Sequence, residues 1–279
     1  MIVPSTDGVE IAVHDLGGHG PTLLLSHATG FHGYCYEPLA HALADRFHAI
    51  AFDFRGHGDT PRPDGAVDWN RYADDAEVMA VWAVEQQGGR PIDAFGHSMG
   101  GACLLMAAHR RPTLFRRLVL FEPIVMPPDS AFPSDPEANP MVIAARRRRA
   151  TFASYQAVID NYSSKPPLAG FTPEAMQAYV RHGFAPDDNG VHLKCRPDTE
   201  ADTFAMSRGH DTSDRLPEID TEVLVLSGRV EEMQPSRVAA GVAERLPNGR
   251  YLQLDELDHF GPMTHPHLVA DIIAESLTP

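Results

Sequence analysis

Apolar residues follow two different spacings along this chain. Short runs of apolar and aromatic residues predict strands, and the longer stretches between them repeat apolar positions every three or four residues, as amphipathic helices do. Residues 118–121 and 223–226 are apolar throughout, as strands are when helices cover both faces of their sheet. The predicted strands are 10–16, 22–26, 48–54, 92–95, 118–121, 223–227 and 250–254, and the predicted helices are 37–46, 70–87, 101–110, 235–246 and 267–277. This order predicts an α/β fold with a mostly parallel, doubly wound sheet.

The alternation of strands and helices stops in the middle of the chain. A stretch rich in proline opens this segment at 127–140, and helical patterns follow at 141–162 and 173–182 without a strongly apolar strand between them. An insertion that leaves one end of a sheet forms a lid over that end. We therefore predict an α/β core of residues 1–125 and 217–279, with residues 126–216 inserted as a helical cap.

Four consecutive arginines, residues 146–149, lie inside the longer predicted cap helix. Such a run can indicate a nucleic-acid patch, but four consecutive residues point around nearly the whole circumference of a helix, and the rest of the protein is acidic. We interpret the run as a solvated helix with local ion pairs.

The composition limits the classes of function. The 279 residues are 43% hydrophobic and 22% charged, the balance of an ordinary globular protein, and the net charge of −15 argues against nucleic acid and anionic membranes as partners. Three widely spaced cysteines, Cys35, Cys103 and Cys195, predict neither a disulfide framework nor a zinc site. The first residues lack the pattern of a signal peptide, and no apolar run approaches the ~20 residues of a membrane span. We expect a cytoplasmic protein.

The most informative motif is Gly-His-Ser-Met-Gly at residues 96–100. It lies between a predicted strand and a predicted helix, where a serine in a very tight turn adopts strained backbone angles and holds its hydroxyl clear at the positive end of the helix. The small residues on either side allow neighbouring backbones to approach. This context predicts that Ser98 is a nucleophile.

A serine hydroxyl needs a base that takes its proton, and the tetrahedral intermediate that it forms needs hydrogen-bond donors for its oxyanion. Of the fifteen histidines, His259 lies in the loop between the last predicted strand and the last predicted helix, and such loops meet at the carboxyl edge of the sheet. We therefore predict His259 as the base. The backbone N–H of Met99, directly after the serine, is one predicted oxyanion donor, and the turn after strand 22–26 is expected to supply the other.

In this order, Gly-His-Ser-Met-Gly, Asp-Phe-Arg-Gly-His-Gly at 53–58 and Asp-His-Phe-Gly-Pro at 258–262 resemble the α/β-hydrolase superfamily over residues 10–123 and 223–277. The resemblance implies Ser98 as nucleophile, His259 as general base, and Thr29 with Met99 as oxyanion donors. The family's usual His-Gly-x-Pro turn reads His27-Ala28-Thr29-Gly30 here, a departure that affects the donor at Thr29 more than the one at Met99.

The resemblance leaves two candidates for the acid that orients the histidine. The family's most common position falls on Glu231, where an aspartate is usual. Some haloalkane dehalogenases and certain lactone hydrolases instead place a glutamate after the next strand, which corresponds to Glu122. Both glutamates remain candidates, and Glu122 is the marginally preferred one.

The serine nucleophile favours acyl transfer to water over the alkyl-enzyme chemistry of the family members that use aspartate. We predict a serine hydrolase of a carboxylic ester, lactone or related acyl bond, with a Ser-His-Glu triad and neither cofactor nor metal. The alternatives are carbon–carbon bond hydrolysis, cofactor-free perhydrolase or haloperoxidase activity, and a non-catalytic binding protein.

The predicted partner is a small, partly apolar acyl substrate, and a homodimer stays open. The predicted substrate-binding residues are Phe31, His32, Tyr34, Phe152 and Tyr155.

Overall fold

The computed structural model describes residues 1–127, 135–232 and 234–278. Its main sheet has eight strands in the order β1-β2-β4-β3-β5-β6-β10-β11. The strands are β1 Ile2–Pro4, β2 Glu10–Gly18, β3 Thr22–Ser26, β4 His48–Phe52, β5 Ile92–His97, β6 Phe115–Phe121, β10 Glu222–Ser227 and β11 Gly249–Gln253. The strands β1 and β2 pair antiparallel, as do β2 and β4, and the remaining neighbours are parallel. The predicted α/β fold and its mostly parallel sheet are confirmed.

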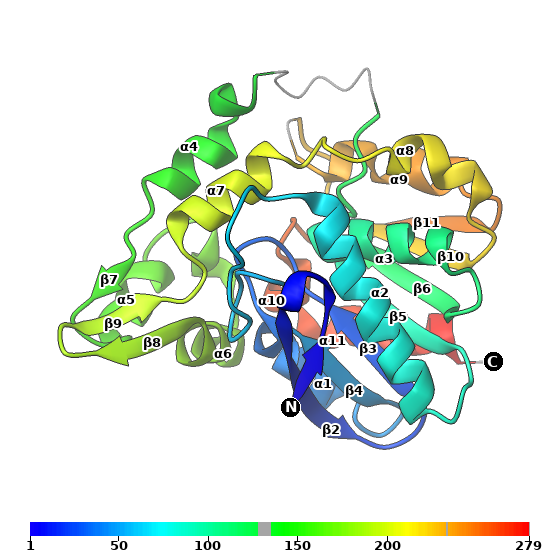
Figure 1. Ribbon diagram of the computed structural model, residues 1–279, viewed down its shortest axis with the longest axis horizontal. Coiled ribbons are helices and arrows are strands. Elements are labelled where there is room, and N and C mark those ends of the chain that lie inside the picture. The colour runs from blue at the N-terminus through cyan, green and yellow to red at the C-terminus, as the bar shows by residue number, and fades with distance from the viewer. Residues whose placement is uncertain (128–134, 233, 279) are drawn as a thin grey trace.

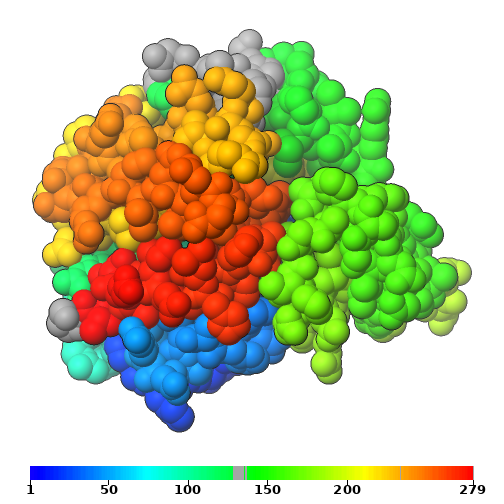
Figure 2. Space-filling model, turned by 180° about the vertical axis from the view of Figure 1, so that it is seen from behind, coloured from blue at the N-terminus to red at the C-terminus, as the bar shows by residue number. Residues whose placement is uncertain are grey.

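Two layers of helices bury the two faces of this sheet (Figures 1 and 2). In β3, Leu24 joins the core under one layer, whereas Leu23 and Leu25 join the core under the other, because successive side chains of a strand point to opposite faces. The first layer contains α2 Trp69–Gln86, α3 Met99–Arg110 and α9 Ser236–Arg245. The second contains α1 Glu37–Ala42 and α11 Pro266–Leu277, and both appear on the face shown in Figure 2.

The predicted core elements all exist, with ends that differ by a few residues, and β1 is an addition. Only three residues long, β1 pairs with β2 at the edge of the sheet, too short to leave a hydrophobic pattern. The remaining short helices of the core are α8 Thr212–Arg215 and α10 Gly261–Thr264. The 3₁₀ helices are Thr6–Gly8, Gly33–Tyr36, Pro136–Ala138, Leu168–Gly170 and Leu216–Glu218. Among the described residues, no helix has the length and apolar character needed to cross a membrane.

Residues 135–205, between β6 and α8, lie beside the core and are only partly helical (Figure 1). The helices of this segment are α4 Pro140–Arg146, α5 Tyr155–Ser163, α6 Pro173–Gly183 and α7 Pro197–Ala205. A small antiparallel sheet of β7 Thr151–Phe152, β8 Phe184–Asp187 and β9 Gly190–Leu193 joins them in the order β7-β9-β8. The inserted segment thus contains a small sheet besides the predicted helices; its strands have two to four residues, and the sequence shows no strongly apolar run there. Part of the proline-rich stretch lies outside the described residues.

The prediction of a single helix over 141–162 is wrong, because the chain leaves the helical conformation after α4 and re-enters it at α5. The hydroxyl of Ser154 accepts a hydrogen bond from the N–H of Ala157 at 3.2 Å and caps the start of α5. Consequently, the four arginines do not lie on one helix. Arg146 is the last residue of α4 and pairs with Glu137 at 2.8 Å near the surface, whereas the side chain of Arg148 is largely buried.

Candidate active site

Ser98 occupies a tight turn between β5 and α3 at the carboxyl edge of the sheet. Its backbone angles are φ 56° and ψ −118°, a conformation that L-residues seldom adopt and that surrounding contacts must hold. A Cβ on Gly96 would lie 2.7 Å from the Cα of Gly101, and one on Gly100 would clash with the carbonyl of Ser26. The glycines of the motif therefore permit the close packing of strand, turn and helix that holds Ser98 in place.

The structure brings Ser98, His259 and Glu122 into one hydrogen-bonded row. His259 lies between β11 and α10; its Nε2 is 3.2 Å from Oγ of Ser98, and its Nδ1 is 2.6 Å from Oε2 of Glu122. Since a carboxylate only accepts, Nδ1–H donates to Glu122, and Nε2 is left to accept the proton of the serine hydroxyl.

Glu122 lies directly after β6 and is fully buried. Its other oxygen, Oε1, accepts a hydrogen bond from the backbone N–H of Gly228 at 2.8 Å, so both oxygens are satisfied. Its own φ is 46°, a second uncommon backbone angle beside that of Ser98. A buried carboxylate held by two donors in a strained backbone is typical of a functional position.

Glu231 is not brought to His259. It lies in the loop after β10 with 45% of its side chain exposed, and its Oε1 is 2.8 Å from the guanidinium of Arg229. The position that the family uses most often for the acid is therefore occupied here by a surface ion pair.

Met99 and Thr29, the two predicted oxyanion donors, lie next to each other. Met99 is the first residue of α3, where N–H groups have no acceptor within the helix. Thr29 lies in the turn after β3, and its hydroxyl contacts Sδ of Met99 at 3.5 Å. This turn and the start of α3 thus meet beside Ser98.

A buried hydrogen-bond network ties the three loops of the site together. The Nε2–H of His97 donates to the carbonyl of His259 at 2.8 Å, and Nδ1 of His97 accepts from the hydroxyl of Tyr36 at 2.8 Å. That hydroxyl oxygen also accepts from the N–H of Ala28 at 3.2 Å, in the turn that carries Thr29. Burial lowers the pKa of His97 well below its ordinary value, and the nearby His259 lowers it further. His97 is therefore neutral, as these two hydrogen bonds require.

Aromatic side chains from the core and the cap pack around Phe31. Its ring centroid is 6.1 Å from that of Phe260, which directly follows His259, and 6.1 Å from that of Phe171. The ring of Tyr179 in α6 packs edge-on at 5.4 Å. The structure therefore places Phe31 between the loop of His259 and the cap. Phe260 belongs to the Asp-His-Phe-Gly-Pro motif that carries His259, whereas no motif in the sequence points to Tyr179.

His32 and Tyr34 join the core to α6 and do not contact the Ser98–His259–Glu122 row in the described hydrogen bonds and ring contacts. The Nε2–H of His32 donates to the carbonyl of Tyr179 at 3.1 Å, and burial lowers the pKa of His32 to about 4. The ring of Tyr34 lies between those of His14 and His182, at centroid distances of 4.3 and 3.8 Å.

Phe152 and Tyr155 lie elsewhere in the cap. Phe152 is buried against the rings of Phe184 and Tyr162 at 5.9 and 6.0 Å and belongs to the cap's own core. Tyr155 is 37% exposed, and its hydroxyl donates to the carbonyl of Phe184 at 3.4 Å. In the described hydrogen bonds and ring contacts, neither side chain touches the Ser98–His259–Glu122 row, and their part in substrate binding stays a prediction.

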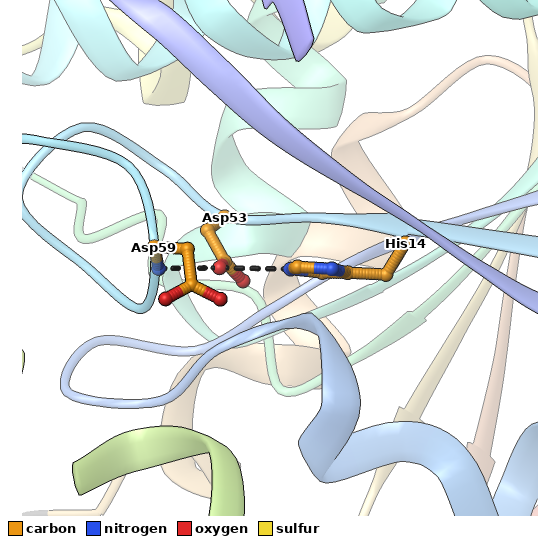
Figure 3. A group of neighbouring side chains, drawn as sticks. All are labelled: His14, Asp53 and Asp59. Atoms are coloured by element: carbon orange, nitrogen blue, oxygen red, sulfur yellow. Dashed lines mark hydrogen bonds and ion pairs between the residues drawn. The ribbon is translucent and has the colours of Figure 1, made fainter. Parts of the chain in front are cut away.

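A further group, His14, Asp53 and Asp59, is close enough to be considered for a metal ion (Figure 3). The oxygens of Asp53 already accept from the N–H of Gly33 at 2.7 Å, the N–H of Asp59 at 2.8 Å and Nε2–H of His14 at 2.8 Å. Burial alone would raise the pKa of Asp53, but the hydrogen bond and charge of His14 lower it below its usual value. These donors account for the buried carboxylate, which holds the Gly33 and Asp59 loops together.

The sequence is similar to those of known hydrolases over most of its length. The sequence profile described as "Alpha/beta hydrolase family" matches residues 23–272. The chain is 26% identical over 263 residues to the 2-(acetamidomethylene)succinate hydrolase of Mesorhizobium japonicum, covering 92% of this chain and 87% of the relative. It is 27% identical over 265 residues to a putative carbamate hydrolase of Agrobacterium fabrum, covering 93% and 94%.

A solved structure has the same fold. The crystal structure of E-2-(acetamidomethylene)succinate hydrolase superposes with a TM-score of 0.81 at 22% identity, over 99% of this chain and 98% of that one. The long profile match, together with relatives that are hydrolases across nearly the whole chain, leads to one conclusion. This chain belongs to the alpha/beta hydrolase family.

Proposed function

We propose that this protein is a serine hydrolase that cleaves a carboxylic ester, a lactone or a related acyl bond through an acyl-enzyme. The observation that carries the proposal is the row from Ser98 through His259 to Glu122, in which each side chain can make the hydrogen bond that its role needs. Glu122, rather than Glu231, is proposed as the acid because only Glu122 is in hydrogen-bond contact with His259.

In the first half-reaction, Oγ of Ser98 attacks the substrate carbonyl carbon while Nε2 of His259 takes the hydroxyl proton. The carbonyl π electrons move to oxygen, and the backbone N–H groups of Met99 and Thr29 stabilise the resulting oxyanion. When the carbonyl re-forms, the bond to the leaving group breaks, and Nε2–H gives that group its proton. Glu122 stabilises the imidazolium through Nδ1–H.

In the second half-reaction, water takes the place of the serine hydroxyl and attacks the acyl-enzyme by the same sequence of proton transfers. One relative hydrolyses an acetamido compound and the other is a putative carbamate hydrolase, so the proposed range of cleaved bonds includes acyl C–N bonds. The neutral His97, which holds the carbonyl of His259 and the Tyr36 hydroxyl, is proposed to keep base and oxyanion turn in register.

A fluorophosphonate probe tests the nucleophile directly. The wild-type protein is expected to be labelled and Ser98→Ala is not, and hydrolysis of p-nitrophenyl acetate should fall by about 10⁴-fold or more in the variant. Ser213 is a buried serine in α8 whose hydroxyl accepts a hydrogen bond from Arg245, outside the row; Ser213→Ala is the matched control and should label like the wild type. No labelling of the wild type, or equal labelling of Ser98→Ala, would contradict the proposal and favour a non-catalytic binding protein.

A further inference from the structure

Arg148 carries a buried positive charge inside the cap. After α4 ends, the chain turns inward, and the guanidinium donates to Oε2 of Glu200 at 2.7 Å, to the hydroxyl of Tyr162 at 3.1 Å and to the hydroxyl of Tyr179. Only 14% of the Arg148 side chain and 11% of the Glu200 side chain remain exposed. The pair is thus nearly enclosed, yet both side chains keep a small accessible surface.

This ion pair lies against the turn that carries Thr29. Gly30 follows Thr29, and a Cβ added to Gly30 would be only 2.5 Å from Oε1 of Glu200. The ring of Tyr179, whose hydroxyl accepts from Arg148, packs on Phe31, the next residue of the turn. Two of the three partners of Arg148 therefore contact residues 30 and 31, beside the proposed oxyanion donor.

The cluster keeps unused hydrogen-bonding capacity. Within the described residues, hydrogen bonds to Glu200 use Oε2 and leave Oε1 as an acceptor. The hydroxyls of Tyr162 and Tyr179 both accept from Arg148, which leaves each hydroxyl hydrogen for another acceptor. The cluster therefore presents an acceptor and donors side by side.

The charges of the cluster cancel, and this decides which ligand suits it. Because Glu200 already neutralises Arg148, an added carboxylate would be desolvated beside a negative charge without an unpaired cation to compensate it. Lys194 and Arg62 are already paired, at 2.5 Å from Asp59 and 3.1 Å from Asp202, and the adjacent Arg149 is exposed and donates to the carbonyl of Thr151. An uncharged amide or urea group, which offers both N–H and C=O, matches the acceptor and donors of the cluster.

We propose that the Arg148–Glu200 pair selects the substrate's acyl part, favouring an acyl chain that ends in an uncharged amide- or urea-type group over one that ends in a carboxylate. This proposal rests on the proposed function, since it assumes that the carbonyl carbon reacts at Ser98. It makes Arg148 and Glu200 binding residues with no part in the proton transfers. A purely structural ion pair would give no such selectivity.

Three p-nitrophenyl esters of nearly equal size test the selectivity: 5-carbamoylpentanoate, 5-carboxypentanoate and heptanoate. For the wild type, kcat/KM for the carbamoyl ester should exceed that for the carboxy ester by about tenfold or more, and should also exceed that for the heptanoate. A carboxy or heptanoyl ester hydrolysed as well as the carbamoyl ester would overturn the proposal, while Ser98-dependent turnover of all three would leave the proposed function standing.

Glu200→Gln makes the test sharper because it keeps the size of the side chain and leaves the charge of Arg148 uncompensated. The ratio of kcat/KM between carbamoyl and carboxy esters should fall by about tenfold or more, through KM, with fluorophosphonate labelling of Ser98 retained. Glu137→Gln removes the acid from the exposed Arg146 pair and is the matched control, with no change in the ratio. An unchanged ratio in labelled, folded Glu200→Gln refutes the proposal. If this variant does not fold, the wild-type ratios alone decide.

Discussion

The loops after β6 and after β10 start from neighbouring parallel strands, and each carries a glutamate that the sequence offers as the acid. Glu122, after β6, is fully buried and hydrogen-bonds to His259. Glu231, after β10, has 45% of its side chain exposed and pairs with Arg229. Two identical side chains at one edge of a sheet thus have opposite surroundings.

The difference shows that the available hydrogen-bond donors decide which carboxylate can be buried. Desolvation of a carboxylate is costly unless donors replace the water, and Glu122 has the N–H of Gly228 and Nδ1–H of His259. The loop after β10 therefore still contributes to the acid, through its backbone N–H. Glu231 lies four residues after the end of β10, and the guanidinium of Arg229, two residues away, satisfies its carboxylate at the surface.

The largest expected effect separates the two glutamates by activity. Glu122→Gln should lower kcat for p-nitrophenyl acetate by about 10³–10⁴-fold, because the amide can hold His259 in the wrong tautomer and cannot stabilise the imidazolium. Glu231→Gln should change kcat by less than about twofold, because an exposed ion pair contributes little. Steady-state kinetics on both purified variants, with circular dichroism to check folding, gives the answer. A large loss in Glu231→Gln with a small one in Glu122→Gln would reverse the comparison.

The second effect concerns the pH dependence of stability. The buried histidines His27 and His32 contribute to it through burial, the property that also separates the buried Glu122 from the exposed Glu231. Burial lowers the pKa values of the two histidines to about 3 and about 4, so both are neutral in the folded protein at pH 5, whereas the unfolded chain binds protons below about pH 6.5. Stability should therefore fall as the pH falls from 6.5 towards 4, by about 2 kcal/mol per histidine at pH 5.

Urea unfolding at pH 7, 6 and 5 measures this dependence. In His32→Gln, which keeps a donor for the carbonyl of Tyr179, the stability at pH 7 should be lower, but the loss between pH 7 and pH 5 should be smaller by about 2 kcal/mol. A pH dependence as steep as in the wild type would mean that His32 does not titrate as its burial requires.

The third effect concerns Gly228, the backbone donor of the β10 loop. A Cβ there would lie 2.5 Å from the carbonyl oxygen of Leu257, so Gly228→Ala should push the β10 loop away from Glu122. We expect a loss of about 1–3 kcal/mol in the free energy of unfolding, together with about tenfold lower kcat. Gly241→Ala in α9, where a Cβ meets nothing within 4 Å, is the control and should stabilise by about 0.5–1 kcal/mol. Equal effects of the two substitutions would mean that the β10 loop has no role in the site.

The core strands and the tight turn around Ser98 could be predicted from sequence because they depend on local signals. Buried strands read as apolar runs, and the motif around Ser98 lies at a strand-to-helix junction that these runs define. The choice between Glu122 and Glu231 could not be made in this way. It depends on which carboxylate meets the N–H of Gly228, a contact between residues 106 positions apart.

The cap was predicted least well, for physical reasons. Its strands are as short as two residues and pair antiparallel with one another, so they are too short to show an alternation of apolar and polar residues in the sequence. Arg148 sits in a run of arginines that looks solvated by composition, and only the end of α4 at Arg146 turns it inward. The Ser154 cap before α5 was the one local signal that could have divided the predicted helix.

The backbone of Ser98 is bonded on both sides to the segment that leads into the cap. Its N–H donates to the carbonyl of Phe121 at 2.9 Å, and its carbonyl accepts from the N–H of Ile124 at 3.2 Å. Ser98, the proposed nucleophile, Glu122, the proposed acid, and the exit of the chain from the core thus form one braced unit. A chimera that takes its cap from another family member should therefore begin the foreign sequence after Val125, so that every bond that braces the serine is inherited from this chain.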